Sequence, residues 1–312
     1  MDRVKKSIHY YCSSTIKEKN RGKGVGVVVF DTGAAPHPDI MKQIIYFEDL
    51  LHGRQTPYDD CGHGTHVCGI IAGNGIASNG KYTGISREAS LIVLKVLGEH
   101  GEGNVEDILA GVYWVLQNYR KYRIRIANLS VGAGGELDEE KEQKLLAAVE
   151  AMWDVGIAVI VSAGNLGPGK GTITIPGNSK KVITVGAVDR TGRLMEHSGR
   201  GPTKACVIKP DIITEGQNVI SCNHLYVEEK NGQIPSPYNM KSGTSMATPI
   251  VSGAAALYFS KYPEKSNVEL KLKLRQTCEH SYINRGISRK FGEGSGWGLL
   301  RVDRLLSDNG FS

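Results

Sequence analysis

The feature that most restricts the fold of this chain is a succession of short, continuous apolar runs separated by longer, mixed segments. Runs with the length and composition of buried strands lie at residues 23–30, 91–96, 126–131, 157–162 and 182–187. Strands that are apolar on both faces are typical of parallel sheets covered by helices on each side. The runs therefore predict an α/β fold in three layers, with a mostly parallel central sheet and helices on both faces.

The segments between these runs predict the helices that cover the sheet. Helices are expected at residues 63–74, 105–119, 138–154, 245–261 and 267–278. Ser266 and Glu269 have the spacing of a capping box at the start of the last one. In sheets of this kind the chemistry lies in the loops beyond the carboxyl ends of the strands. The residues that follow each apolar run are therefore the first candidates for function.

Length and pattern indicate one large domain. The chain has 312 residues, enough for a substantial core, and no repeat, low-complexity segment or linker divides it. Residues 1–21 are polar and show no clear period, so we expect an N-terminal extension there. A single domain is expected over residues 22–312.

Composition excludes several partners. The net charge is +6, but the basic residues are mixed with acids and form no tract typical of nucleic-acid binding. No apolar run approaches the roughly 18 residues of a membrane span, and no signal-peptide pattern is visible. Six cysteines spread over a large domain indicate free thiols in a reducing compartment. We expect a cytoplasmic protein that binds neither nucleic acid nor a membrane; its oligomeric state is not predicted.

The tripeptide Asp31-Thr32-Gly33 follows the first apolar run and fits two kinds of protease chemistry. An aspartic protease needs two carboxylates that share a proton, hence a second such tripeptide or a dimer. This chain has one, and its α/β pattern does not match the small, all-β dimeric enzymes. A serine protease instead uses one buried aspartate to orient a histidine. A structural role as the polar end of a strand is the third alternative.

The stretch DDCGHGTHVCGIIAG, residues 59–73, places His63 at the start of an expected helix. The positive end of the helix dipole disfavours imidazolium, as suits a general base at rest. A structural role is expected for His66. Zinc could use Cys61, His63, His66 and Cys68, but Cys68 would point about 140° away from His63 on a helix. A Cys61–Cys68 disulfide is disfavoured because the helical path spans about 10 Å, beyond the bridgeable distance.

Two further stretches contain polar residues suited to acyl transfer. In KSGTSMATPIVSG, residues 241–253, Ser245 lies where a glycine-containing loop becomes a helix. A serine there is often an N-cap, but a helix N-terminus also favours the negative charge that nucleophilic attack creates. In IAVIVSAGN, residues 157–165, a buried strand leads to Asn165, which is either a turn residue or an amide donor for an oxyanion hole.

Taken together and in the order Asp31, His63, Asn165 and Ser245, these residues resemble the subtilisin family of serine proteases (subtilases). The resemblance covers about residues 22–307. It rests on Asp31-Thr32-Gly33, Gly62-His63-Gly64-Thr65-His66, and Gly243-Thr244-Ser245-Met246-Ala247-Thr248-Pro249. The layout is most similar to bacterial intracellular-type subtilases. A subtilisin-like fold is implied for the domain.

The resemblance implies peptide-bond hydrolysis through an acyl-enzyme. Ser245 would be the nucleophile, His63 the general base and acid, and Asp31 the group that orients the imidazole and stabilises its cation. The Asn165 amide and the Ser245 backbone N–H would hold the oxyanion. No cofactor is required. A structural calcium ion is possible because it is common in the family, although residues 73–84 contain no carboxylate and no metal ligand is assigned.

The same resemblance implies how peptide or protein substrates bind. An extended peptide would lie between two backbone edges, which favours broad specificity. The implied substrate-binding residues are Gly101, Gly103, Ser130, Val131, Gly132, Ala163, Gly164 and Thr174. No carboxylate lies in the implied pocket walls, so an apolar or medium-sized residue is expected before the scissile bond (P1). A processing-type preference for Lys or Arg is the alternative.

Departures from the family pattern bear on regulation. Cys68 replaces a small alanine, and Cys61 lies two residues before His63. Residues 1–21 are too short for the family's folding pro-domain, and the two alternatives for them are an inhibitory arm and a stabilising arm. Residues 223–240 are expected to form a long loop near Ser245 that either gates the substrate or is idle. The alternative function is a catalytically silent subtilase fold used for binding or regulation, which the filled triad positions oppose.

Overall fold

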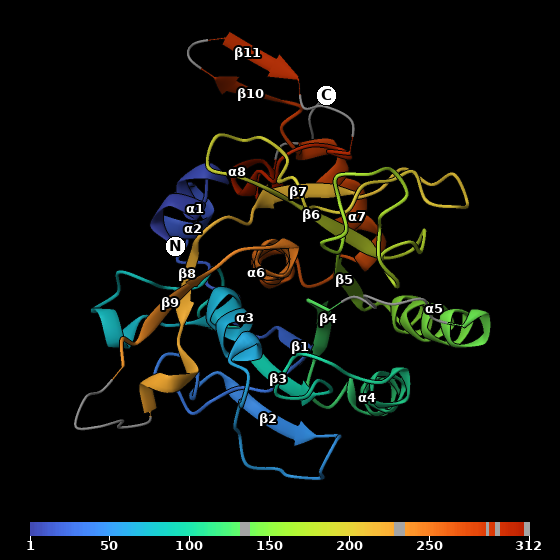
Figure 1. The fold of residues 1–312 in the computed structure, drawn as a ribbon. Coiled ribbons are helices and arrows are strands. Elements are labelled where there is room, and N and C mark those ends of the chain that lie inside the picture. The colour runs from blue at the N-terminus through green and yellow to red at the C-terminus, as the bar shows by residue number, and fades with distance from the viewer. Residues whose placement is uncertain (132–137, 228–234, 285–286, 291–293, 309–312) are drawn as a thin grey trace.

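A seven-stranded parallel sheet organises the molecule. The computed structural model describes residues 1–131, 138–227, 235–284, 287–290 and 294–308 (Figure 1). The strands stand in the order β2-β3-β1-β4-β5-β6-β7, and every pairing is parallel. Their bounds are β1 (Gly26–Asp31), β2 (Ile44–Asp49), β3 (Ser90–Lys95), β4 (Ile124–Leu129), β5 (Ala158–Ser162), β6 (Ile183–Val188) and β7 (Ile212–Glu215). The expected α/β class is confirmed.

The chain reverses its direction of travel across the sheet at β1. Strands β2 and β3 lie on one side of β1, and the chain then crosses over to β4 on the other side. At such a reversal the loops after neighbouring strands separate and leave a crevice at the carboxyl edge. Asp31 ends β1 and Ser130 follows β4, so both lie at this edge.

Helices cover both faces of the sheet, as expected. Helix α3 (His63–Ala72) and helix α6 (Thr244–Lys261) pack against each other on one face (Figure 1). Helix α4 (Val105–Asn118) and helix α5 (Glu139–Asp154) pack together on the other (Figure 1). Helix α7 (Asn267–Thr277) adjoins α5 through the Asn267 amide, which donates to Trp153 O over 2.7 Å, and it begins with the expected capping box at Ser266.

Strand β2 is an element that the apolar runs do not indicate. It lies at the edge of the sheet and pairs only with β3. Only Phe47 and Asp49 are buried in this strand, in contrast to the fully buried β1. An edge strand with one solvated face needs no continuous apolar run, and this explains why the run-based prediction missed it.

The N-terminal segment is packed into the domain. It forms α1 (Asp2–Ser7) and α2 (Ser13–Ile16). Val4 and Ile8 join the hydrophobic core, and Arg3 forms an ion pair with Glu215 at the end of β7. Ile8 O also accepts a hydrogen bond from Val302 N, at the start of α8 (Val302–Leu305). None of the described residues 1–21 lines the cleft discussed below.

Part of the predicted 223–240 loop is a β-hairpin. Strand β8 (Val219–Cys222) pairs antiparallel with β9 (Tyr238–Lys241), so the loop prediction is wrong for residues 238–240. Asn223 N also donates to Pro237 O over 3.0 Å, which extends the pairing. Residues 228–234 of this stretch lie outside the described residues. The hairpin leads directly into α6.

The remaining elements are short. They are the 3-10 helices η1 (Ile76–Ser78) and η2 (His224–Val227) and the hairpin of β10 (Ser281–Asn284) and β11 (Ile287–Lys290). All six cysteines are free thiols. Within the described part of the chain, no helix combines the length and the hydropathy needed to cross a bilayer.

Candidate active site

Asp31 and His63 form a hydrogen-bonded pair between the end of β1 and the start of α3. The Asp31 side chain is fully buried. Its Oδ1 atom accepts hydrogen bonds from His63 Nδ1 over 2.7 Å and from Thr32 N over 2.8 Å. Because a carboxylate only accepts, the proton of the neutral ring lies on Nδ1 and the lone pair lies on Nε2. The pair therefore holds His63 in the tautomer that a general base requires.

The carboxylate of Asp31 dominates the basicity of His63. Burial of the ring, of which 24% remains exposed, lowers its pKa, but the charge of Asp31 and its hydrogen bond raise the pKa above the usual 6.5. Lys241 lowers it by a smaller amount. The dipole at the start of α3 predicts a neutral ring, yet the adjacent carboxylate is the stronger influence and favours the imidazolium.

Glycines let the two motifs touch backbone to backbone. A Cβ atom on Gly64 would collide with the carbonyl oxygen of Gly33, and one on Gly33 would collide with that of Tyr58. Gly33 also has a φ of 115°, a conformation that favours glycine. Thr32 Oγ1 accepts a hydrogen bond from Gly64 N over 2.9 Å. This close approach brings the first residue of α3 to the end of β1.

Asp59 caps the start of α3, a role that the sequence reasoning missed. Its Oδ1 atom accepts from Gly62 N, and its Oδ2 atom accepts from Thr65 N, each over 2.8 Å. The hydroxyls of Thr32 and Thr65 also donate to it. Gly62, the N-cap residue, has no side chain with which to cap the helix. An aspartate just before a helix start is a known capping signal and could have identified this residue.

Lys95 is a buried cation behind Asp31, and it too was missed. Its side chain is fully buried at the end of β3. Its Nζ atom donates to Thr32 O and Asp60 Oδ1 over 2.8 Å and to Leu97 O over 2.7 Å. Lysines are rarely buried, so pattern reasoning assigns them to the surface. Here one ammonium group ties the loop after Asp31 to the loop after β3 and to the segment before His63.

Ser245 is the second residue of α6, not its N-cap. The N-cap is Gly243, with a φ of 141° and no side-chain cap. Asn165 lies beside this helix start, where its Oδ1 atom accepts from Thr244 N over 3.2 Å and from Thr244 Oγ1 over 3.1 Å. Because the amide oxygen is engaged in this way, the Asn165 Nδ2 group is left as the donor. The helix N-terminus and this amide can together stabilise an anion next to Ser245.

His63, Ser245 and Asn165 line one cleft of about 550 Å³. In the described part of the chain, Ser245 Oγ and His63 are not hydrogen-bonded to each other. Catalytic hydrogen bonds are often long or misaligned without substrate and tighten when it binds. The cleft therefore brings the predicted base, nucleophile and oxyanion donor to one cavity, with Asp31 behind the base.

The structure places the predicted substrate-binding residues in three ways. Gly101, Gly103, Ser130 and Val131 line the cleft. Gly132 lies outside the described residues. The other three do not line it. Ala163 and Gly164 are buried. Thr174 packs so closely behind Gly164 that a Cβ atom on Gly164 would collide with the Thr174 side chain. Ile175 and Pro176, the next two residues, line the cleft instead.

Most of the remaining cleft wall is apolar. It is formed by Leu97, Val105, Ile108, Leu129, Leu145 and Ile175. Charged groups are few: Glu102 lines one part of the cleft, and Lys241 lines another. Such a surface can bury apolar side chains of a peptide, while its backbone edges accept and donate hydrogen bonds.

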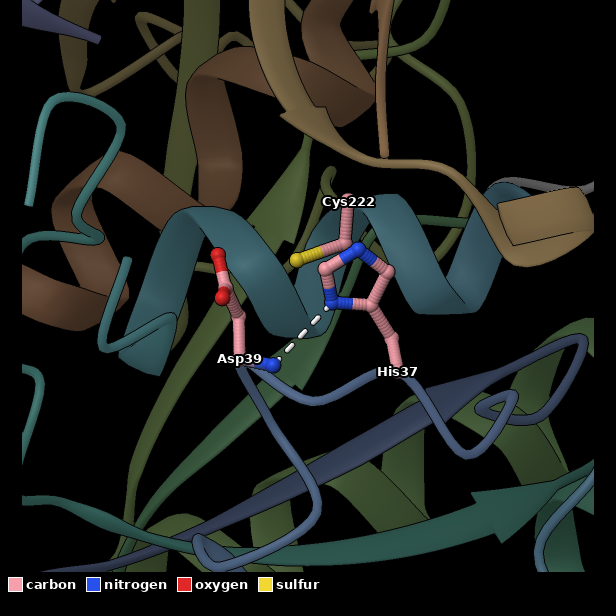
Figure 2. A group of neighbouring side chains, drawn as sticks. All are labelled: His37, Asp39 and Cys222. Carbon is pink, nitrogen blue, oxygen red and sulfur yellow. Dashed lines mark hydrogen bonds between the residues drawn. The ribbon is translucent and has the colours of Figure 1, made fainter. Parts of the chain in front are cut away.

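A second cluster of potential metal ligands lies apart from this cleft. The ligand atoms of His37, Asp39 and Cys222 lie within 4.8 Å of one another (Figure 2). His37 Nδ1 accepts from Asp39 N over 3.1 Å, and its Nε2–H donates to Pro237 O over 2.9 Å. Both ring nitrogens are thus engaged, and a metal would have to displace a backbone hydrogen bond. The cluster is a closed polar network that holds the start of β9.

The same network bears on calcium. The fold brings the carboxylate of Asp39 to the 73–84 loop, which has none of its own. Its Oδ1 atom accepts from Ala77 N over 2.8 Å, and its Oδ2 atom accepts from Tyr238 OH over 2.6 Å. Calcium prefers several free oxygen ligands. Both oxygens of the available carboxylate are already used, so these residues do not fit a strong calcium site.

The zinc alternative around His63 receives no support from the geometry. Cys61, His63, His66 and Cys68 do not bring their ligand atoms together in the described chain. His66 is fully buried, and its Nε2–H donates to Val219 O over 3.1 Å. Burial lowers the pKa of His66 to about 3. His66 therefore stays neutral and has a structural role, as expected.

Comparisons with known proteins agree with this geometry. A sequence model of the subtilase family matches residues 22–294. Serine protease AprX of Bacillus subtilis (strain 168) is 44% identical over 265 residues, which cover 80% of this chain and 60% of AprX. The major intracellular serine protease of the same strain is 36% identical over 255 residues, which cover 79% of this chain and 71% of that protein. This chain thus spans less than two thirds of the length of AprX.

Solved structures show the same likeness. The structure of Sphericase aligns with a TM-score of 0.75 at 30% sequence identity, covering 90% of this chain and 92% of that one. The family match extends over most of the domain that contains the Asp31–His63 pair, Ser245 and Asn165. The chain belongs to the subtilase family of serine proteases.

Proposed function

We propose that this chain is a serine endopeptidase that hydrolyses peptide bonds through an acyl-enzyme. The observation that carries the proposal is the 2.7 Å hydrogen bond between His63 Nδ1 and Asp31 Oδ1 beside a cleft that also contains Ser245 and Asn165. An imidazole with its lone pair on Nε2 can take the proton of a serine hydroxyl. The family membership of the chain supports the same chemistry.

The steps follow from these positions. As Ser245 Oγ bonds to the scissile carbonyl carbon, its proton passes to His63 Nε2, and Asp31 stabilises the imidazolium. Asn165 Nδ2 and the Ser245 backbone N–H donate to the oxyanion. Collapse of this intermediate breaks the C–N bond, and His63 protonates the leaving amine. Water then attacks the ester by the same route and releases the acid.

The proposed substrates are peptides and proteins of varied sequence with an apolar or medium-sized P1 residue. Support comes from the apolar cleft wall and from the backbone edges at Gly101, Gly103 and Ser130. A panel of peptides that differ only at P1 tests this preference. We expect Leu, Met or Phe to exceed Arg in kcat/KM; a strong preference for Arg would instead indicate a processing-type enzyme.

A fluorophosphonate probe, which labels activated serines, tests the function itself. We expect it to label the wild-type chain once, and we expect Ser245→Ala to abolish both labelling and peptide hydrolysis. Ser242→Ala, three residues away and on an exposed residue, is the matched control and should be labelled normally. Absence of labelling and of hydrolysis in a folded wild-type protein would favour the catalytically silent alternative.

We also propose that catalysis needs no cofactor, that neither nucleic acid nor a membrane is a partner, and that the protein acts in the cytoplasm. The name of the major intracellular relative supports the location. For calcium, the engaged oxygens of Asp39 support at most weak binding. Chelation should therefore lower Tm by less than about 2 °C. A larger fall, reversed by added calcium, would show a strong site.

A further inference from the structure

Lys241 places an unpaired positive charge in the cleft. It is the last residue of β9, four positions before Ser245, and it lines the same cavity as His63 and Ser245. Among the described residues, no carboxylate forms an ion pair or hydrogen bond with it. Its charge is close enough to lower the pKa of His63 and that of His66. A cation in this position is available to a substrate.

The side of the cleft next to the start of α4 carries negative charge, because Glu102 lies two residues before the N-cap of this helix. Glu102 lines the cleft and also an adjoining hollow of about 640 Å³, whose wall includes Glu99, Asp107 and Asp60, the last paired with Lys95. Carboxylates repel acidic side chains, particularly where water is partly excluded. The two ends of the cleft therefore differ in sign, and an acidic side chain of a substrate is favoured only near Lys241.

The chemistry assigns these ends to the two halves of a substrate. His63 protonates the leaving amine, so the segment that leaves must begin beside His63. The edges at Gly101–Gly103 and Ser130 would hold the acyl segment, next to α4. In Figure 1, α3 lies between the β8–β9 hairpin and α4, and the hairpin contacts α3 through β8. The end of β9, where Lys241 lies, is therefore the side on which we expect the segment that follows the scissile bond.

We propose that Lys241 is a specificity-determining residue that selects Asp or Glu in the first two positions after the scissile bond. The inference rests on the proposed peptidase function and specifies its substrates further. Lysine carries a compact charge on a flexible stem, so it can reach a carboxylate at either position. Because the charge is partly exposed, the preference should be modest and should weaken as salt increases.

The experiment compares three quenched fluorescent peptides that are identical except for Asp, Asn or Lys directly after the scissile bond, with the cleavage point verified by mass spectrometry. For the wild-type chain at low salt, we expect kcat/KM to be about two- to fivefold higher for Asp than for Asn, and lowest for Lys. High salt should remove most of this difference. Ratios between substrates for one enzyme preparation do not depend on how much of it is folded.

Three variants identify the source of the preference. Lys241→Met keeps the length of the side chain and should make the Asp and Asn peptides equivalent, whereas Lys241→Glu should reverse the order and favour Lys. Lys23→Gln is the control for the loss of one positive charge, because exposed Lys23 precedes β1 at the end opposite to Asp31. It should keep the wild-type ratios.

The outcomes separate this inference from the function on which it rests. Wild-type cleavage with equal rates for the three peptides, or a preference that survives in Lys241→Met, overturns the role of Lys241 and leaves the peptidase intact. Failure of the wild-type chain to cleave any peptide or to react with the fluorophosphonate probe overturns the peptidase and this inference together.

Discussion

The structure contains two histidine–aspartate pairs, one at the start of α3 and one formed by His37 and Asp39, and their hydrogen bonds run in different directions. In the first pair, the carboxylate of Asp31 accepts from the ring of His63. In the second, the ring of His37 accepts from the backbone N–H of Asp39, and the Asp39 carboxylate binds Ala77 N and Tyr238 OH instead. The pKa of His63 is raised by its carboxylate, whereas burial lowers the pKa of His37.

The difference shows that residue type alone does not decide which histidine can act as a base. His37 has donors and acceptors at both ring nitrogens and is fully buried. His63 uses one nitrogen for Asp31 and faces the cleft with the rest of its ring. A saturated network stabilises a fold, but a base must keep one lone pair for its substrate. Access and an unused lone pair, more than the presence of His and Asp, distinguish the reactive pair.

The largest loss of activity is expected from a substitution that breaks the first pair. Asp31→Asn keeps the shape of the side chain but removes the charge and favours the wrong tautomer of His63, so kcat/KM should fall by about 10⁴-fold. Asp39→Asn is the matched change in the second pair and should leave kcat/KM within about threefold. Steady-state kinetics of both variants checks the contrast, and comparable losses would show that the two pairs do not differ in function.

The next effect concerns the support of the first pair. Lys95→Met leaves Thr32 O, Leu97 O and Asp60 without their shared donor. Because two carbonyl oxygens lose their donor while Asp60 stays exposed to water, the free energy of unfolding should fall by about 2–4 kcal/mol, as measured by urea denaturation. Lys209→Met is the control: Lys209 is equally buried and binds Asp211, remote from the cleft. Both variants should lose stability, but at temperatures where both are folded only Lys95→Met should lower kcat/KM.

A smaller effect tests the second pair. Tyr238→Phe removes the hydroxyl that donates to Asp39 Oδ2 and leaves a buried carboxylate oxygen unpaired. The free energy of unfolding should fall by about 1–2 kcal/mol, with no change in the pH dependence of kcat/KM. Tyr113→Phe, on an exposed side chain of α4, should change neither quantity. A shifted pH profile in Tyr238→Phe would connect this network to catalysis and weaken the contrast.

The fold was largely predictable because its signal is local. Five apolar runs became β1, β3, β4, β5 and β6, since each strand is buried on both faces. Strand β2 was missed because one of its faces is solvated, and β9 was missed because its sequence, YNMK, has no strand pattern. Val4 and Ile8 were assigned to a polar extension, but tertiary contacts bury them.

The candidate site was predictable where motifs are long, and less so where contacts are not local. Asp31, His63 and Ser245 stand in motifs and Asn165 ends a buried run, and the structure places three of the four on one cleft with Asp31 behind. Asp59 and Lys95 act through partners that only the fold brings near. Thr174 was expected at a pocket base, yet it packs behind Gly164, and the next residue, Ile175, lines the cleft.

The smallest expected effect is a shift in the pH dependence of kcat/KM, which depends on the charges around the first pair. His63 must be neutral to act as a base, so kcat/KM falls as the pH drops through its pKa. Asp31 raises that pKa, and Lys241 lowers it. Lys241→Met should therefore raise the pKa of His63 and move the acid limb to higher pH at low salt. Lys23→Gln should cause no shift, and high salt should erase the one in Lys241→Met. An acid limb that stays in place or moves to lower pH would mean that the charge of Lys241 does not act on His63.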